Sequence, residues 1–335
     1  MTTRWGILAT GRIARDFATN LRSVPEAVLA AVGSRSLESA EAFARANGDD
    51  DTRAHASYDA LVADPDVDVV YVASPHAVHL EHARLAFDAG KPVLCEKPLT
   101  LNRPDGEALF AAAGDLFCME AMWMACHPLV REIRRRLLAG DFGTPRQVHA
   151  DLGFVVPRTA SARMVERDLG AGALLDMGIY PLTFARLMLG PFARVAASAD
   201  LSSAGFDLDV AIAATHESRA VSALTTSMTS VSPTTATIAT DEGRLDFPAG
   251  FHHPTHVTWT SQDGETERIE PPSPVLGTGL GNEAAHVQDC LRDGLSESPL
   301  VPRAQTLELL DVMDEIRRQI GVRYAADGSG DPSDG

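Results

Sequence analysis

A lysine follows directly after a buried strand in the segment VLCEKP, at residues 93–98. The apolar run at 93–95 is typical of a strand covered on both faces, and Pro98 ends it because proline cannot continue a sheet. Ligands gather at the carboxyl ends of parallel strands, where Glu96 and Lys97 would lie. A solvated surface charge is the commoner role for a lysine. At this edge, however, its ammonium group could stabilise negative charge that develops on a bound molecule.

The first strand-to-helix turn is close to a dinucleotide-binding fingerprint. In WGILATGRIARDF, Ala9, Gly11 and Ala14 hold the positions of the G-x-G-x-x-G/A pattern. Gly11 would let the backbone approach a pyrophosphate, with Arg12 and Ile13 beside it at the helix start, and Ala14 would let the helix pack on the strand. Because Ala9 replaces the first glycine, an ordinary tight turn is also compatible with this segment.

An arginine between two serines follows the second predicted strand, as Ser34, Arg35 and Ser36. An acidic residue at this place would bind the 2′-hydroxyl of a ribose, whereas a guanidinium group and two hydroxyls suit a 2′-phosphate. This favours NADP(H) as the cofactor, with NAD(H) possible. A second, compatible interpretation is that Ser36 caps the following helix and Arg35 lies in solvent.

Polar residues also follow the strand VVYVAS, which ends at Ser74 and Pro75. His76 and His79, at the start of the next helix, could line the cofactor groove at the same sheet edge. Together with His82 they suggest a metal site, but steps of three residues drift around a helix, so the three rings would not converge. No carboxylate pattern completes such a site, and we expect no bound metal.

Alternating strands and helices must position these residues. Over residues 4–122, short apolar runs alternate with amphipathic stretches, which predicts a parallel sheet with helices on both faces. After residue 145 the pattern predicts a long helix at about 172–188 and then Thr- and Val-rich strands joined by hairpin signals. Two helices, at about 280–294 and 303–320, complete the pattern.

These elements predict an α/β protein with two domains. Residues 1–122 would form a dinucleotide-binding domain, and residues 123–325 an α+β domain with a large, mostly antiparallel open sheet. The C-terminal helix at 303–320 could pack back on the first domain. Residues 326–335, rich in Gly, Ser and Asp, are predicted to be a disordered tail.

The composition narrows the class of protein. The chain has 335 residues, 45% of them hydrophobic, and a formal net charge of −17, which argues against a nucleic-acid partner. No apolar run approaches the ~18 residues of a membrane span. The N-terminus enters a strand without a signal-peptide pattern, so we expect a cytoplasmic protein. The four cysteines show no metal-ligand spacing.

The segment CEKP, with the fingerprint before it and GAGALLDMGIYPL (residues 170–182) after it, resembles the Gfo/Idh/MocA family of NAD(P)-dependent oxidoreductases. The resemblance covers nearly the whole chain and is closest to the branch of dihydrodiol dehydrogenase and xylose dehydrogenases. It implies an N-terminal Rossmann domain and a C-terminal α/β domain that binds substrate. The open sheet face of that domain commonly forms a dimer contact, which implies a homodimer or a dimer of dimers.

The resemblance also implies roles for individual residues. Lys97 matches the catalytic lysine of the family, and Tyr180 takes the place of its usual proton donor or acceptor. Asp176 matches an acidic residue near the reacting hydroxyl, and Trp123 an aromatic residue near the nicotinamide. Asp176 and Tyr180 are four residues apart, so on one helix they would share a face. The alternative for this pair is an ordinary contact between helix and core.

These roles imply hydride transfer between a nicotinamide and a CH–OH or C=O carbon of a sugar, cyclitol or diol-like substrate. Tyr180 would be the general acid/base, although a phenol with a pKa of ~10 needs help at neutral pH. The ammonium group of Lys97 would lower that pKa and hydrogen-bond the substrate oxygen. The reversed assignment, with Lys97 transferring the proton, remains open.

The sequence departs from many relatives after the tryptophan, because Ala125 stands where they carry an arginine that often faces the active site. Arg158 and Arg163, before the 170–182 motif, are candidates for binding a polar or anionic substrate, and surface positions are equally compatible. Three histidines near a hairpin of the second sheet are interpreted as structural or interface residues: His252, His253 and His256.

Two other functions fit the same fold. Some relatives are NAD-dependent glycoside hydrolases, which oxidise a sugar transiently on a retained cofactor. Others are non-catalytic dinucleotide sensors, which tend to lose the lysine and the tyrosine. Both Lys97 and Tyr180 are present here, which argues against the sensor.

Overall fold

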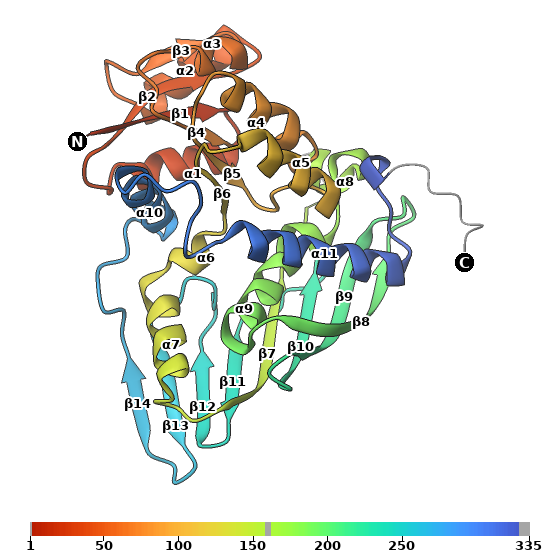
Figure 1. Cartoon of the computed structure of the whole chain (residues 1–335). Coiled ribbons are helices and arrows are strands. Elements are labelled where there is room, and N and C mark those ends of the chain that lie inside the picture. Colours follow the sequence, from red (N-terminus) through yellow and green to blue (C-terminus); the bar gives the residue numbers. More distant parts are fainter. Residues whose placement is uncertain (1, 158–161, 328–335) are drawn as a thin grey trace. The chain divides into compact units, whose positions relative to one another are not determined.

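The structure of the chain, a computed structural model, describes residues 2–157 and 162–327 and divides into two units (Figure 1). The first unit comprises Met1–His127 and Pro274–Leu307, and the second Pro128–Ser273 and Glu308–Gly335. The segment 274–307, which the sequence analysis assigned to the second domain, therefore belongs with the N-terminal residues. The α/β architecture predicted from the sequence is confirmed.

A six-stranded sheet forms the centre of the first unit, in the order β3-β2-β1-β4-β5-β6. Its strands are β1 (Thr3–Leu8), β2 (Ala27–Gly33), β3 (Arg53–His55), β4 (Val69–Val72), β5 (Val93–Glu96) and β6 (Cys118–Ala121). Every pairing is parallel, and every residue of β4, β5 and β6 is buried. The strand order reverses between β1 and β4, which is the place where sheets of this type bind ligands.

Helical segments accompany these strands in the first unit, and several are capped by side chains. They are α1 (Arg12–Leu21), α2 (Leu37–Asn47), α3 (Tyr58–Val62), η1 (His76–Val78), α4 (His79–Asp88), α5 (Arg103–Ala113), α6 (Trp123–Cys126) and α10 (Leu280–Arg292). Ser36, Ser57 and Asn102 each accept a backbone N–H at the start of α2, α3 and α5. Such caps satisfy donors that the first helical turn leaves unpaired.

Segment 274–307 joins the first unit through α10, which packs against α1 and α6. The backbone N–H of Thr278 donates to Asn20 Oδ1 at 2.6 Å, and the Gln288 side chain donates to the Glu26 carbonyl. These contacts cover the apolar sides of α1 and α6. Without them, the N-terminal segment alone would expose those sides to water.

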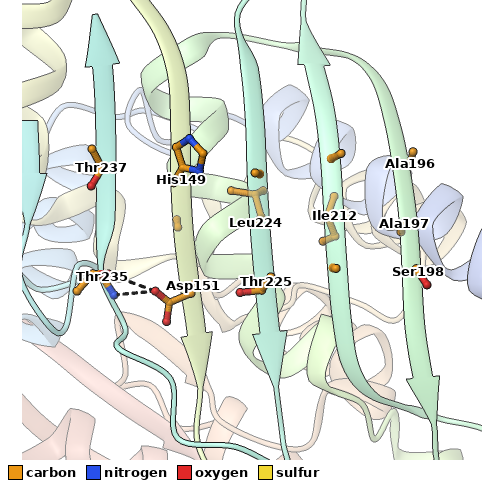
Figure 2. A pocket seen from close by; sticks show the side chains of 14 residues that line it. His149, Asp151, Ala196, Ala197, Ser198, Ile212, Leu224, Thr225, Thr235 and Thr237 are labelled. Atoms are coloured by element: carbon orange, nitrogen blue, oxygen red, sulfur yellow. Dashed lines mark hydrogen bonds between the residues drawn. The ribbon is translucent and has the colours of Figure 1, made fainter. Parts of the chain in front are cut away.

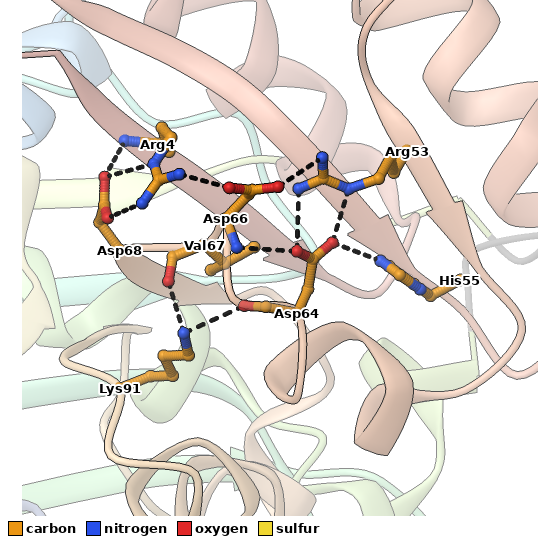
Figure 3. A network of polar contacts seen from close by, with 8 residues as sticks. All are labelled: Arg4, Arg53, His55, Asp64, Asp66, Val67, Asp68 and Lys91. Carbon is orange, nitrogen blue, oxygen red and sulfur yellow. Dashed lines mark hydrogen bonds and ion pairs between the residues drawn. The ribbon is translucent and has the colours of Figure 1, made fainter.

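A network of charged side chains lies at the amino-terminal ends of the first sheet's strands (Figure 3). Its members are Arg4, Arg53, His55, Asp64, Asp66, Asp68 and Lys91. Asp64, with its side chain 4% exposed, accepts two hydrogen bonds from Arg53 and faces His55 Nε2 at 2.9 Å. Lys91 donates to the carbonyls of Asp64 and Val67. The network thus ties the loop before β4 to β1 and β3.

An eight-stranded sheet forms the second unit, in the order β14-β13-β12-β11-β7-β10-β9-β8. The strands are β7 (Pro145–Gly153), β8 (Phe192–Leu201), β9 (Asp207–His216), β10 (Val221–Ser227), β11 (Ala236–Thr240), β12 (Gly243–Phe247), β13 (Val257–Ser261) and β14 (Thr266–Ile269). Only the pair formed by β7 and β10 is parallel among the described strands of this sheet. The predicted mostly antiparallel sheet is confirmed.

One face of this sheet packs on helix α9 (Ile179–Leu189), which contacts β7 and β10. The other helical segments of the unit are α7 (Pro128–Ala139), α8 (Ala162–Val165), η2 (Arg167–Leu169), η3 (Leu174–Gly178), α11 (Arg303–Ile320), which begins in the first unit, and η4 (Ala325–Asp327). Sequence periodicity predicted one helix over 172–188. The structure instead begins it with the π-helical turn η3, a form that often occurs at functional sites.

The opposite face of the sheet presents small side chains to solvent (Figure 2). Along β9 and β10, burial alternates residue by residue, so Ala211 and Ala213 are exposed while Val210 and Ile212 are buried. This two-residue period is expected of a sheet with one covered face. Asp151 on β7 accepts hydrogen bonds from the backbone of Thr234 and Thr235, which fixes the entry to β11.

Residues 326–335 were predicted to be a disordered tail, but the first two of them have a defined structure. Ala326 and Asp327 lie in η4, where the Asp327 carboxylate pairs with Arg317 at 2.6 Å. This ion pair attaches Asp327 to helix α11. The amino-acid composition of the tail, on which the prediction of disorder was based, does not indicate such a contact. Residues 328–335 of the predicted tail lie outside the described part of the chain. None of the described helices is long and apolar enough to span a membrane.

Candidate active site

The turn after β1 leaves an open helix N-terminus at the carboxyl edge of the first sheet. Gly11 is extended at the start of α1, and a Cβ atom there would meet no atom within 4 Å. Within the described residues, no side chain caps α1 and no acidic residue lies in its first turn. The N–H groups around Arg12 and Ile13 can therefore bind an anion such as a pyrophosphate.

Ala9, at the first glycine position of the fingerprint, adopts a left-handed backbone with φ +83°. Its N–H donates to the Gly33 carbonyl at 3.0 Å, which holds the ends of β1 and β2 together. Glycine adopts this conformation freely, whereas alanine is strained by its Cβ atom. The turn thus keeps the shape that the fingerprint requires even though its usual residue is missing.

Arg35 is an exposed cation at the end of β2, beside a serine that caps α2. The Ser39 N–H donates to Ser36 Oγ at 3.2 Å, so the capping role suggested by the sequence is confirmed. Within the described part of the chain, Arg35 forms no hydrogen bond or ion pair. Burial lowers the pKa of His82, the negative charge of Glu81 opposes this, and the positive charge of Arg35 adds to it. Ser34 is buried.

His79, predicted to line the cofactor groove, is buried between the turns that follow β4 and β5. The side chain is 1% exposed. Its Nδ1 lies 3.1 Å from the carbonyls of both Pro98 and Leu99, and its Nε2 lies 2.8 Å from the carbonyl of Ser74. Burial lowers the pKa of His79 to about 4. The ring therefore links the turn after β4 to the turn after β5.

The neighbouring residues of this turn are also largely buried. His76 is buried with its ring 6.5 Å from that of His79, and Ser74 Oγ lies 2.8 Å from His82 Nδ1. Pro75 is partly exposed. Among the described residues, no group of three or more His, Cys, Asp or Glu side chains could hold a metal ion.

The E-K-P turn holds its lysine through carboxylate contacts to the backbone. Glu96 is buried and accepts hydrogen bonds from the Tyr71 hydroxyl and from the Lys97 N–H. The peptide bond between Lys97 and Pro98 is cis. Lys97 itself is partly exposed at the carboxyl end of β5. Glu96 thus fixes the backbone of the turn, and Lys97 is the more exposed residue of the pair.

A second buried carboxyl group lies close to this turn. Glu120, on β6, accepts hydrogen bonds from the Leu99 N–H at 2.9 Å and from Thr306 Oγ1 at 3.1 Å. Burial raises the pKa of Glu120 to about 7, and the hydrogen bonds and the positive charge of Lys97 oppose that rise. The sequence analysis did not identify Glu120 as part of the site, although it lies only three residues before Trp123.

Trp123 begins α6, directly after β6. A Cβ atom at Gly279, where φ is +119°, would lie 2.7 Å from the indole ring, so the start of α10 packs on this tryptophan. A glycine is needed there because any side chain would meet the ring. Ala125, where many relatives carry an arginine, is buried within α6.

In the second unit, Asp176 and Tyr180 lie on the continuous helical segment η3–α9. Tyr180 is 7% exposed, and its ring lies 4.9 Å from that of His252 at an angle of 47°. Asp176 is partly exposed in the π-helical turn. Arg163 lies in α8, and its side chain, like the whole of Arg158, is outside the described residues.

The start of this segment is held by groups that sequence reasoning did not identify. The Leu174 N–H donates to Asp207 Oδ2 at 2.6 Å, and the Tyr324 hydroxyl donates to the Ala171 carbonyl at 2.8 Å. A Cβ atom at Gly172 would lie 2.4 Å from Asp207 Oδ1. Gly172, the second glycine of the GAG triplet, is therefore the sequence feature that indicates how closely the Asp207 carboxylate approaches this backbone.

Two family models match the chain. One, described as an oxidoreductase family with an NAD-binding Rossmann fold, matches residues 3–120, and the other, the GFO/IDH/MocA C-terminal domain, matches residues 130–246. Together they cover the six-stranded sheet and a large part of the second unit.

Relatives of known activity match over almost the full length. Trans-1,2-dihydrobenzene-1,2-diol dehydrogenase from Xenopus laevis is 34% identical over 336 residues, which covers 97% of this chain and 100% of the relative. The NADP⁺-dependent D-xylose 1-dehydrogenase from Hypocrea jecorina is 34% identical over 365 residues, with 96% and 93% covered.

Solved structures match as well. A 3-ketoreductase from Actinomadura kijaniata, in complex with NADP and TDP-benzene, superposes with a TM-score of 0.83 at 27% identity, covering 97% of this chain and 99% of that one. An aldose-aldose oxidoreductase from Caulobacter crescentus has a TM-score of 0.85 at 23% identity, with 95% and 97% covered, which shows a shared fold. With the fingerprint turn and the E-K-P turn at one sheet edge, these similarities show that the chain belongs to the Gfo/Idh/MocA family of NAD(P)-dependent oxidoreductases, in the branch of the dihydrodiol and xylose dehydrogenases.

Proposed function

We propose that this protein transfers a hydride between NADP(H) and a CH–OH or C=O carbon of a sugar, cyclitol or diol-like substrate. The observation that carries the proposal is the position of Lys97. Lys97 is partly exposed at the end of β5, on the same sheet edge as the open N-terminus of α1. An anion site and a cationic amine on one edge suit a bound dinucleotide with its reacting end near the lysine.

The residues at the sheet edge fit NADP(H). The α1 N-terminus would hold the pyrophosphate, and the exposed guanidinium of Arg35 beside Ser36 would hold the 2′-phosphate. When bound, this cofactor supplies or accepts the hydride. Two similar proteins, the xylose dehydrogenase and the 3-ketoreductase, carry NADP in their names or complexes, which supports the preference over NAD(H).

In the proposed mechanism, two side chains handle the substrate oxygen. In the reducing direction, the carbonyl carbon receives the hydride while the Tyr180 hydroxyl gives its proton to the oxygen, and the reverse holds for oxidation. Lys97 donates a hydrogen bond to the same oxygen and stabilises its developing negative charge. Its positive charge also makes the phenol a better acid. Asp176 and Trp123 would orient the substrate.

A substrate panel tests this function. The named substrates of the two dehydrogenases, a dihydrodiol and D-xylose, both carry adjacent hydroxyl groups, so aldoses, polyols and vicinal diols should be screened with NADP⁺ and with NAD⁺. We expect net formation of reduced cofactor with at least one of these compounds. A cofactor that stays bound with no net reduction, together with cleavage of a glycoside, would favour the hydrolase. Binding without any turnover would favour the sensor.

We also propose that a second copy of the chain covers the open face of the eight-stranded sheet. Fourteen residues line the hollow in Figure 2, and among them Asp151 is the sole carboxylate. In a chain of net charge −17, the alanine-rich part of this face around Ala211 and Ala213 can meet its own copy with few carboxylates nearby, and Asp200 and Asp209 line the adjoining hollow. The small side chains would also let the two sheets approach closely.

The proposed location is the cytoplasm. All four cysteines are free and buried, which suits a compartment that keeps thiols reduced. Fractionation of the source cells would test this.

A further inference from the structure

The loop between β12 and β13, at residues 248–256, places an aromatic ring against Tyr180. Its ring partner there is His252, with centroids 4.9 Å apart. The neighbouring Phe251 is fully buried and packs edge-on against Phe184, with centroids 5.3 Å apart at 77°. Two consecutive loop residues thus contact two residues of α9 that are one helical turn apart.

Backbone hydrogen bonds fix this loop. The N–H groups of Gly250 and Phe251 both donate to the Thr234 carbonyl, at 2.9 and 3.1 Å, and the His253 N–H donates to the Gly250 carbonyl at 2.8 Å. Thr234 is held in turn by Asp151, which accepts its N–H at 2.7 Å. A continuous series of contacts therefore runs from strand β7 to the ring of His252.

The close turn at Gly250 is part of the same support. Gly250 has φ +80°, and a Cβ atom there would lie 2.8 Å from the ring of His253. The His253 ring lies 4.4 Å from that of His252 and nearly perpendicular to it, at 88°. The imidazole of His252 is thus held between its neighbour and the phenol, on a loop with little freedom to move.

We propose that His252 is a positioning residue for the proposed acid/base Tyr180, through the contact of its ring with the phenol ring. This inference rests on the proposed function. Aromatic pairs at this separation attract each other beyond their shared burial. A phenol held in one orientation keeps its hydroxyl aligned with the substrate oxygen, and small misalignments lower catalytic rates strongly. The ring, and not its ionisation, is what the role requires.

Three variants test this inference with the substrate that the panel identifies. We expect His252→Ala to lower kcat on the order of 10-fold while the Kd for NADPH stays unchanged. His252→Phe, which keeps a ring, should restore kcat to within about 3-fold of the original value. His256→Ala is the matched control, because within the described residues the hydrogen-bond partner of His256 is the exposed hydroxyl of the neighbouring Thr255, and it should leave kcat unchanged. Thermal unfolding of each variant shows whether the fold is retained.

The outcomes separate this inference from the proposed function. An unaltered kcat in His252→Ala would overturn the positioning role, as would failure of His252→Phe to restore the rate. If His252→Ala does not fold, His252→Leu takes its place, since it fills similar space without a ring. If Tyr180→Phe keeps full turnover, Tyr180 is not the acid/base and the positioning role fails with that assignment, whereas the proposed function fails if the panel gives no net formation of reduced cofactor. If Tyr180→Phe lowers turnover, a variant that combines His252→Ala with Tyr180→Phe should be no slower than Tyr180→Phe alone. His252 acts through the Tyr180 hydroxyl, which Tyr180→Phe already lacks.

Discussion

Lys97 is held by two buried carboxyl groups that contact the backbone on either side of it. Glu96 accepts the N–H of Lys97, and Glu120 accepts the N–H of Leu99. Because both carboxyl groups are engaged by backbone donors, the backbone of the turn that carries Lys97 has a defined path. At the scale of single residues, this explains why a hydrophobic strand ends in a glutamate, a lysine and a proline.

The first prediction concerns the proposed catalytic pair. Lys97→Ala and Tyr180→Phe should each lower turnover by roughly 10²-fold or more, because each removes a group that acts on the substrate oxygen in the transition state. NADPH binding, measured by fluorescence titration, should be retained. Turnover close to that of the unmodified enzyme in both variants would refute the assignment.

The second prediction concerns cofactor choice. Arg35→Asp should raise the KM for NADP⁺ by at least about 10-fold and leave the KM for NAD⁺ nearly unchanged, because the carboxylate repels a 2′-phosphate and can accept a 2′-hydroxyl. Arg45→Asp is the control, since Arg45 is an exposed arginine near the other end of α2. Equal ratios of the two KM values in both variants would show that Arg35 has no part in the choice.

At the scale of elements, the helical segment with Asp176 and Tyr180 depends on groups distant in the sequence. Burial raises the pKa of Asp207, and the Leu174 N–H opposes this rise by donating to the carboxylate. Tyr324, from the C-terminal segment, reaches the Ala171 carbonyl. The start of η3 is therefore fixed by β9 and by the end of the chain together.

The charged network at the amino-terminal edge leads to a prediction about pH. Burial favours the neutral form of Asp64, but hydrogen bonds from Arg53, from the Asp66 N–H and from His55 outweigh it and lower the pKa to about 2. A carboxyl pKa below its unfolded value of ~3.9 stabilises the fold above that value, and the contribution is lost as the pH falls towards about 2.

Asp64→Asn should therefore lower the free energy of unfolding by on the order of 1–2 kcal/mol at pH 7, a figure reduced for solvent screening. The difference from the unmodified protein should shrink between about pH 4 and pH 2. Urea unfolding at pH 7 and pH 3 measures it. Asp66→Asn is the matched control, and a smaller effect is expected because Asp66 is 52% exposed. A difference that is the same at both pH values would contradict the prediction.

Local patterns in the sequence predicted most of the strands and helices, because burial determines the spacing of apolar residues. Continuous apolar runs identified the buried parallel strands, and periodicity placed the last helix at the residues found, Arg303–Ile320. The return of segment 274–307 to the first unit was not predictable, because its contacts to Asn20 and Glu26 span more than 250 positions. The contacts of His79 were not predictable for the same reason, since its partners Pro98 and Leu99 lie in the turn after another strand.

At the scale of the whole molecule, the open sheet face is the proposed contact between copies. Ala213→Arg should shift the chain from dimer to monomer in sedimentation velocity, because a two-fold contact would bury the new charge twice. Ala42→Arg, at an exposed position of α2, is the control and should remain dimeric. A dimer that persists in Ala213→Arg would exclude this face as the contact.

The late return of segment 274–307 has a consequence for biosynthesis. A ribosome releases the chain from its N-terminus, so the nucleotide-binding half must wait for its last helix until nearly all of the polypeptide has been made. During that interval the sides of α1 and α6 that α10 later covers stay accessible to chaperones. A protein truncated after residue 127 would lack α10, so the sides of α1 and α6 would remain uncovered. The two units are therefore better produced as one chain.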